Sequence, residues 1–303
     1  MITVVGSLNM DLVTKTDKVP KVGETFLGVE FKQAAGGKGA NQADAIAKLG
    51  GKVAMIGRVG SDQFGKTLIE SLKHDGVEVS QVQVTEGIST GIATIIVNGD
   101  GDNSIIVVSG ANFKLIPQDI DRAEEVIKES AIMIAQLEVP IGVIKYAFKK
   151  AKQYGKYTVL NPAPARELDQ ELLELTDLLV PNETELEILS GRTLVTKDDM
   201  LVAAKELMQK GVKEMIVTLG GNGCLHINKT SSNHYPAHLV EAVDTTAAGD
   251  SFIGAIATAL SEGKSIEAAI HFAAKVSALT VTREGAQDSL PTKKEVEEYM
   301  TDI

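Results

Sequence analysis

The chain has 303 residues, of which 44% are hydrophobic and 23% charged, with a formal net charge of −11 at pH 7. These values are typical of a soluble globular protein with a sizeable core, and the acidic balance argues against nucleic acid or an anionic membrane as the main partner. A single cysteine, Cys224, excludes an intrachain disulfide and a cysteine-rich zinc site. We expect it to be a buried core thiol. No apolar run approaches the ~18 residues of a membrane span, and the N-terminus lacks a basic leader, so we expect a cytoplasmic protein.

Short β-rich apolar runs alternate with helical patterns along most of the chain. Strands are expected at 2–6, 53–59, 132–138, 158–162, 177–182 and 215–220. Helices are expected at 39–49, 64–74, 118–128, 141–154 and 197–210. This alternation predicts a mostly parallel sheet with helices on both faces. Ligands of such sheets bind at the carboxyl ends of the strands.

Two segments break the alternation. Residues 10–35 are extended and polar, and residues 90–110 form two apolar strands around an Asn-Gly turn, which predicts a hairpin. We expect the two segments to form a small separate sheet. The acidic loop 100–103 resembles the start of a calcium loop, but Ser104 stands at the fifth position and no glutamate closes the pattern. We therefore interpret it as a hairpin turn.

Residues 60–67 match the P-loop pattern G-x-x-x-x-G-K-[ST] and lie between an expected strand and an expected helix. A P-loop surrounds phosphates with small residues, whereas Asp62 and Phe64 would stand where the phosphate binds. We favour a strand-to-helix turn, with Ser61 or Asp62 as the N-cap and Phe64 packed inward. A P-loop remains the second candidate for the nucleotide site.

The segment 244–260 carries two carboxylates, Asp244 and Asp250, around small residues that open an apolar helix. Small side chains at a helix start let a substrate approach the free backbone N–H groups, which attract anions together with the helix dipole. An aspartate at an anion site is unfavourable unless it handles a proton. The segment therefore indicates phosphoryl-transfer chemistry.

Five further polar motifs follow expected strands, and each has a plain structural alternative. Asn9 and Asp11 suit sugar hydroxyls or a turn, and Glu138 suits a hydroxyl or the cap of the next helix. The glycines of residues 36–43 leave the backbone accessible before a helix. A generic glycine-rich turn would explain these glycines, but not Lys38 among them or Asn41 in the first helical turn. Residues 182–185 offer hard oxygen ligands for magnesium or an N-cap with its acidic first turn. The glycine-rich turn 218–223 suits a nucleotide or a hairpin.

The motifs GGKGANQA at 36–43, NPAPA at 161–165, PNETE at 181–185, TLGGNG at 218–223 and DTTAAGD at 244–250 occur in an order that resembles the ribokinases of the PfkB-type carbohydrate kinases. The resemblance covers essentially the whole chain. It implies a three-layer αβα Rossmann-like fold and a single kinase domain over 1–303, with a β lid formed by about 10–35 and 90–110.

The resemblance also assigns roles to individual residues. It implies that Asp250 is the general base for the sugar hydroxyl, with an anion hole formed by Ala247, Ala248 and Gly249. The implied sugar positions are Asn9, Asp11, Gly37, Lys38, Asn41, Glu138 and Asp250. The implied ATP positions are Asn182, Thr218, Gly220, Gly221, Gly223 and Gly249, with Glu185 near Mg²⁺. A monovalent-cation (K⁺) site maps to Asp244, Thr246, Thr280, Arg283, Gly285 and Ser289, where Arg283 would offer its backbone carbonyl.

The implied reaction is ATP-dependent phosphorylation of D-ribose at O5 by a homodimer whose lids clasp. One departure is Ala274, at an adenine-side position where histidine is expected. Another sugar or a nucleoside stays open as substrate, although seven Phe, five Tyr and no Trp disfavour a site that stacks a base. A non-catalytic sugar-binding regulator also stays open. Its mark would be a substituted Asp250 or a broken run at 247–249, and the chain has neither.

Overall fold

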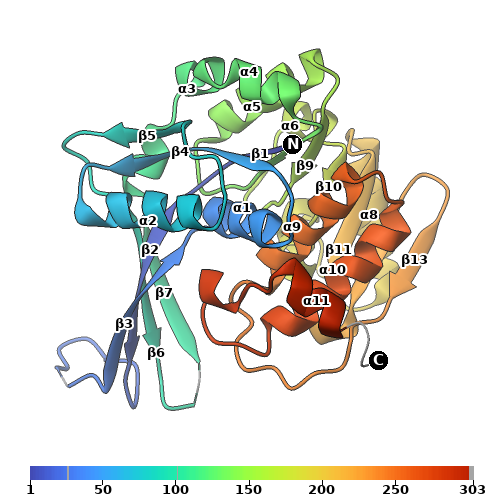
Figure 1. Cartoon of the computed structure of the whole chain (residues 1–303). Helices are drawn as coiled ribbons and strands as arrows, with labels where there is room; N and C mark the ends of the chain where they lie inside the picture. Colours follow the sequence, from blue (N-terminus) through green and yellow to red (C-terminus); the bar gives the residue numbers. More distant parts are fainter. Residues whose placement is uncertain (26, 101, 300–303) are drawn as a thin grey trace.

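The computed structural model describes residues 1–25, 27–100 and 102–299 (Figure 1). Its larger sheet has nine strands in the order β13-β12-β11-β10-β9-β8-β1-β4-β5. The seven strands from β11 to β5 are parallel, and β12 and β13 add an antiparallel edge. The strands are β1 (Ile2–Val5), β4 (Val53–Gly60), β5 (Val82–Thr85), β8 (Ile132–Ala135), β9 (Tyr157–Leu160), β10 (Leu178–Leu179), β11 (Glu214–Thr218), β12 (Cys224–Ile227) and β13 (Ser232–Tyr235).

Apolar side chains alternate along the parallel strands and build a separate core on each face of the sheet. In β8, Ile132 and Ile134 belong to one core and Met133 and Ala135 to the other. The first core is covered by α1 (Lys38–Lys48), α2 (Gln63–His74), α9 (Ala248–Ser261), α10 (Ile266–Thr280) and α11 (Lys293–Tyr299). The second is covered by α3 (Pro117–Arg122), α4 (Glu124–Glu129), α5 (Ile141–Gln153), α6 (Gln170–Glu174), α7 (Glu183–Ser190) and α8 (Lys197–Gln209). The predicted three-layer α/β fold is confirmed.

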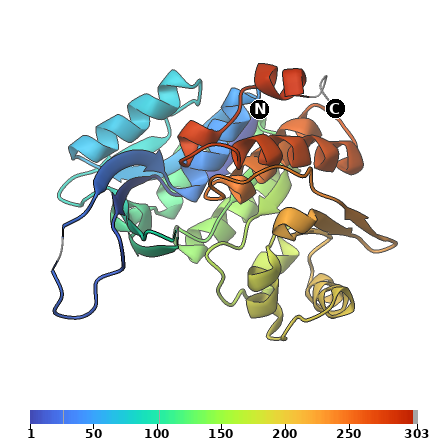
Figure 2. The same cartoon turned by 90° about the horizontal axis from the view of Figure 1, so that it is seen from below.

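The smaller sheet has the order β3-β2-β6-β7, from β2 (Asn9–Lys15), β3 (Glu30–Gly36), β6 (Gly91–Val97) and β7 (Asn103–Val108). Strands β2 and β6 are parallel, and the outer pairs are antiparallel. The two predicted segments do form one sheet, with residues 26 and 101 outside the described part. Strand β2 follows β1 after only Gly6–Leu8, so the small sheet begins at the carboxyl end of β1. Figure 2 shows this sheet beside the helical layers.

Two local expectations can be compared with the structure. The helix expected at 118–128 is two helices, α3 and α4, because ψ of 9° at Ala123 bends the chain there. Ile120, Ala123 and Ile127 are all fully buried in the second core. The turn after β6 is held by the Asn98 side chain, whose Oδ1 accepts from the backbone N–H of Asp100 and Asp102.

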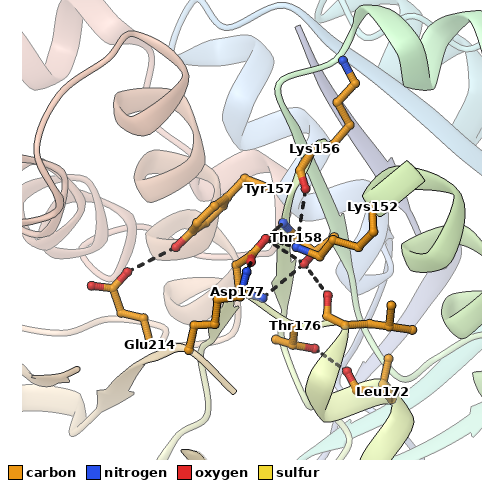
Figure 3. A network of polar contacts seen from close by, with 10 residues as sticks. Lys152, Lys156, Tyr157, Thr158, Leu172, Thr176, Asp177 and Glu214 are labelled. Atoms are coloured by element: carbon orange, nitrogen blue, oxygen red, sulfur yellow. Dashed lines mark hydrogen bonds and ion pairs between the residues drawn. The ribbon is translucent and has the colours of Figure 1, made fainter. Parts of the chain in front are cut away.

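The amino ends of β9, β10 and β11 are joined by a polar network around Asp177 (Figure 3). Its carboxylate accepts from Lys152, from Lys213 at 2.7 Å and from the backbone N–H of Thr158 at 2.8 Å. Tyr157 donates to Glu214 on β11 at 3.2 Å. The network lies at the sheet edge opposite the strand ends that carry the polar motifs, so it stabilises the sheet away from the candidate site.

No helix among the described residues is long and apolar enough to cross a membrane. Cys224 is buried as expected, and burial raises the pKa of its thiol to about 12.

Candidate active site

Two adjoining cavities open at the carboxyl edge of the large sheet, where the polar motifs meet. The first has a volume of about 130 Å³ and is lined by Asn9, Glu138 and the end of β7. The second, of about 200 Å³, is lined by Lys38, Asn182, Glu185, Thr218, Gly249 and Asp250. Because parallel strands end at one edge, residues more than 200 positions apart in the sequence share one site.

Asp250 lies in the first turn of α9, and only 6% of it is exposed. Its Oδ2 accepts from the side-chain amide of Asn41 at 3.0 Å and its Oδ1 from that of Gln42 at 2.9 Å. Both donors lie in α1. The carboxylate is therefore fixed by two neutral N–H donors and stands beside the helix start predicted to bind an anion.

The backbone before Asp250 is open to the cavity at one of the three predicted anion-hole residues. A Cβ built on Gly249 would meet nothing within 4 Å, so a ligand can approach the backbone there. The N–H of Ala248 donates to Thr245 O at 3.2 Å, and Ala247 is buried. Of the three, Gly249 is the residue that lines the second cavity.

Glu138 follows β8 and is held by the start of α1. Its Oε2 accepts from Ser7 Oγ at 2.5 Å and from the backbone N–H of Lys38 at 3.2 Å. Gly37 has φ of 92°, and a Cβ there would lie 2.7 Å from the backbone N of Asn9. Only glycine permits this close approach of α1 to β2.

Burial and neighbouring charges shift the pKa values of ionisable groups in the site. Burial, together with the nearby carboxylates of Glu138 and Asp250, raises the pKa of Asp11 to about 7. Burial alone would lower the pKa of Lys38, but Asp250, Glu138 and other carboxylates hold it above its usual value. Burial also raises the pKa of Glu185. A single buried ammonium thus faces several acids, an arrangement typical of functional sites.

Asn9 is held by Asn112, a residue that the sequence patterns did not single out. Asn112 Nδ2 donates to Asn9 Oδ1 at 2.7 Å and to Leu8 O at 3.1 Å, and its Oδ1 accepts from Leu8 N–H at 2.9 Å. A Cβ on Gly91 would lie 2.2 Å from Asn9 Oδ1. With Oδ1 engaged by Asn112, the other end of the Asn9 amide is a free donor.

Three of the predicted nucleotide residues, Asn182, Thr218 and Gly249, line the second cavity, whereas Gly220, Gly221 and Gly223 are not among its lining residues. Asn182 caps α7 and forms a capping box with Glu185, at 2.7 Å and 2.9 Å, and it pairs with Thr218 across the sheet. Gly220 and Gly221 form a 3₁₀ turn with open space where side chains would stand. At Gly223, φ is 88° and a Cβ would lie 2.0 Å from Tyr235 O. The cap and the hairpin turn are thus both present, at the edge of the cavity.

The residues predicted for a monovalent cation are brought together only in part. Asp244 Oδ1 accepts from Thr246 N–H at 2.9 Å, and Oδ2 from Gly285 N–H at 2.9 Å. Arg283 pairs with Glu295 at 2.8 Å through its side chain, which leaves its carbonyl as the possible ligand. Thr280 ends α10 and Ser289 lies in a 3₁₀ turn. Over residues 1–25, 27–100 and 102–299, no cluster of three or more His, Cys, Asp and Glu could hold a metal ion.

The P-loop look-alike at 60–67 has a structural explanation. Asp62 caps α2, and its carboxylate accepts from Gly65 N–H at 2.9 Å and from Thr90 N–H at 2.8 Å. Phe64 packs against the core, and Lys66 is exposed. Neither cavity described above is lined by this loop. The expected N-cap is confirmed.

Comparison with known proteins agrees with this geometry. The pfkB family carbohydrate kinase pattern matches residues 1–293. The chain belongs to this family. It is 43% identical over 301 residues to the deoxyribokinase of Salmonella typhi, covering 99% of this chain and 98% of that protein. It is 41% identical over 299 residues to the ribokinase of Haemophilus influenzae, with the same coverages of 99% and 98%.

Family membership extends to the three-dimensional structure. The ribokinase of Arabidopsis thaliana, solved with ribose and ATP, superposes with a TM-score of 0.91 at 35% identity, covering 98% of this chain and 97% of that one. The protein is therefore an ATP-dependent carbohydrate kinase of the ribokinase type.

Proposed function

We propose that the protein transfers the γ-phosphoryl group of ATP to O5 of D-ribose, giving ribose 5-phosphate and ADP. The observation that carries this proposal is the position of Asp250. It lines the same cavity as Asn182, Thr218 and Gly249, three of the predicted nucleotide residues, and it accepts a hydrogen bond from Asn41, one of the predicted sugar residues. A carboxylate between the two sites is placed to serve both substrates.

In this proposal Asp250 accepts the proton of the sugar O5 hydroxyl. The oxygen forms a bond to the γ-phosphorus while the bond to the leaving ADP oxygen breaks, and the two electrons of that bond leave with ADP. The backbone N–H of Gly249, at the open start of α9, stabilises the charge on the transferring group, and Lys38 supplies the positive charge between the two sites. Catalysis of this kind depends on positioning and electrostatics.

The sugar would bind to Asn9, Asp11, Gly37, Asn41 and Glu138. Asn9 and Asp11 are 3% and 8% exposed, so each loses free energy if its hydroxyl partner is missing, roughly 1–3 kcal/mol. We therefore propose ribose as the preferred substrate. The 43% identity to a deoxyribokinase makes 2-deoxyribose the second candidate.

Mg²⁺ would enter with ATP and neutralise phosphate charge. Glu185 fits it as one carboxylate at the cavity edge, since Mg²⁺ keeps water and phosphate oxygens as its other ligands. A K⁺ ion would be held by oxygens around Asp244 and Thr246 and by the carbonyl of Arg283. Backbone and hydroxyl oxygens are suitable donors for such an ion.

We also propose a homodimer formed through the small sheet acting as a lid. On one face, its outer strands expose Phe31 at 58%, Ile106 at 66% and Val108 at 48%. An apolar sheet face of this kind is unusual on a monomer and favours a partner. Sedimentation at several concentrations tests the assembly, and a monomer at all of them would contradict it.

The proposed function is tested by measuring ADP release over ribose, 2-deoxyribose, fructose and adenosine, with and without K⁺. We expect ribose to have the highest kcat/KM, by about tenfold or more over 2-deoxyribose, and K⁺ to raise the rate. Asp250→Asn should lose about 10²–10⁴-fold in kcat. If Asp250→Asn keeps its activity and Lys66→Ala loses ATP turnover, the result would instead favour the P-loop at 60–67 as the nucleotide site.

A further inference from the structure

Gln42 contacts the proposed base but does not contribute to either cavity. It is fully buried in α1, next to Asn41 in sequence, and the described residues that line the two cavities do not include it. Its Nε2 donates to Asp250 Oδ1 at 2.9 Å. Any effect of Gln42 on phosphoryl transfer must therefore pass through Asp250.

The orientation of the Gln42 amide is fixed by its other partners. Gln136 Nε2 donates to Gln42 Oε1 at 2.6 Å, and Gln42 Nε2 also donates to Asn161 Oδ1 at 3.2 Å. Asn161 itself donates through Nδ2 to the carbonyl of Val180 at 3.2 Å. A backbone carbonyl can only accept, so the Val180 carbonyl fixes which end of the Asn161 amide is the nitrogen. Asn161 Oδ1 and Gln136 Nε2 then fix the orientation of the Gln42 amide. Its N–H group faces Asp250.

This amide chain has a consequence for the carboxylate. Each oxygen of Asp250 has two acceptor sites, and Gln42 and Asn41 occupy one on each. The carboxylate cannot rotate without losing both bonds, and its remaining lone pairs stay available to a hydroxyl.

We infer that Gln42 is a positioning residue for the phosphoryl-transfer reaction: held by Gln136 and Asn161, its amide fixes the orientation of the Asp250 carboxylate. The inference rests on the proposed role of Asp250 as the base. Asn41 differs from Gln42 because the resemblance places it on the sugar, whereas Gln42 has no route to either substrate except through the carboxylate.

The test compares Gln42→Met, Gln42→Glu and Gln136→Met with the exposed control Gln209→Met. Methionine keeps the volume and removes the amide, so Gln42→Met should lower kcat about 10–100-fold and leave the ribose and ATP KM values within about threefold. Gln42→Glu removes the same N–H donor and places a second carboxylate at Asp250, so its kcat should fall further than that of Gln42→Met.

Gln136→Met keeps Gln42 in place but frees its amide to turn, so kcat should fall about 3–10-fold with both KM values within about threefold. This variant keeps the inference testable if the Gln42 variants do not fold. A folded Gln42→Met, or in its absence a folded Gln136→Met, with the kcat of Gln209→Met would overturn the inference. If Asp250→Asn stays active, the proposed function itself fails. If Asp250→Asn is inactive and Gln42→Met resembles Gln209→Met, only the inference fails.

Discussion

The substitution Asn112→Asp is expected to rotate the side-chain amide of the neighbouring residue Asn9. Asn112 Nδ2 donates to Asn9 Oδ1 at 2.7 Å and to Leu8 O at 3.1 Å. In the variant an oxygen replaces this nitrogen, so it would lie at close range to Asn9 Oδ1, with no hydrogen between the two oxygens. Rotating the Asn9 amide by half a turn replaces the repulsion with a charge-assisted hydrogen bond, worth about 1.5–3 kcal/mol. Asn9 would then present its carbonyl to the cavity instead of its N–H donors.

The cost to the sugar can be estimated from that exchange. A hydroxyl that accepted from Asn9 now meets an acceptor, and a mismatched buried polar group costs about 1–3 kcal/mol, or about 5–150-fold in ribose KM. We expect kcat to change less than threefold, because Asp250 and its two donors are untouched. The orphaned carbonyl of Leu8 should lower the free energy of unfolding by about 1–3 kcal/mol.

Steady-state ADP release with varied ribose, combined with urea unfolding, measures both effects. The exposed small-sheet substitution Asn103→Asp is the matched control. Lowering the pH should reduce the KM defect relative to the unmodified protein, because a protonated carboxyl at position 112 can again donate. A folded Asn112→Asp variant with an unchanged ribose KM would refute the assigned amide orientation of Asn9.

Three other predictions concern acidic residues. The pKa of Asp11 is raised to about 7 by burial, and an ionised carboxylate binds hydroxyls more tightly than a neutral carboxyl does. The KM for ribose should therefore fall as the pH rises through 7. The variant Asp11→Asn should remove this pH dependence. Asp62→Ala removes the cap of α2 and its hydrogen bonds to Thr90, so it should cost about 2–4 kcal/mol of unfolding free energy. Lys66→Ala should leave ATP turnover intact. A stable Asp62→Ala variant together with a Lys66→Ala variant that loses ATP turnover would favour a P-loop. Asp177→Asn removes a buried carboxylate that pairs with two partly exposed lysines, so it should cost about 1–3 kcal/mol of unfolding free energy without changing kcat. A large loss of kcat in the folded variant would contradict a purely structural role.

Much of the fold could be predicted because apolar runs and helical patterns alternate in the sequence. The strand expected at 132–138 and the helix expected at 141–154 correspond to β8 and α5. Boundaries were less accurate, since β8 ends at Ala135 and the polar residues up to Glu138 follow it. The bend at Ala123 was missed, because the helical spacing of its neighbours continues through it.

The candidate site could be predicted where a polar residue directly follows a strand or opens a helix. Asn9, Glu138 and Asp250 are of this kind, and the structure brings them to one edge. Asn112, Gln42 and Gln136 were missed for a physical reason. Asn112 bonds Leu8 across 104 positions, and Gln136 bonds Gln42 across 94. Local spacing carries no signal for such pairs, since only the folded sheet brings them together.

The site draws its polar groups from two sheets. Asn9 and Asp11 belong to β2 of the small sheet, whereas Asn41, Glu138 and Asp250 are held by α1, the segment after β8, and α9. A sugar that contacts both groups must also hold the two sheets in one relative orientation. Part of its binding free energy is then spent on that alignment. Ribose affinity should therefore respond to substitutions in the small sheet that never touch the sugar. The change in affinity should follow the change in the free energy of aligning the two sheets.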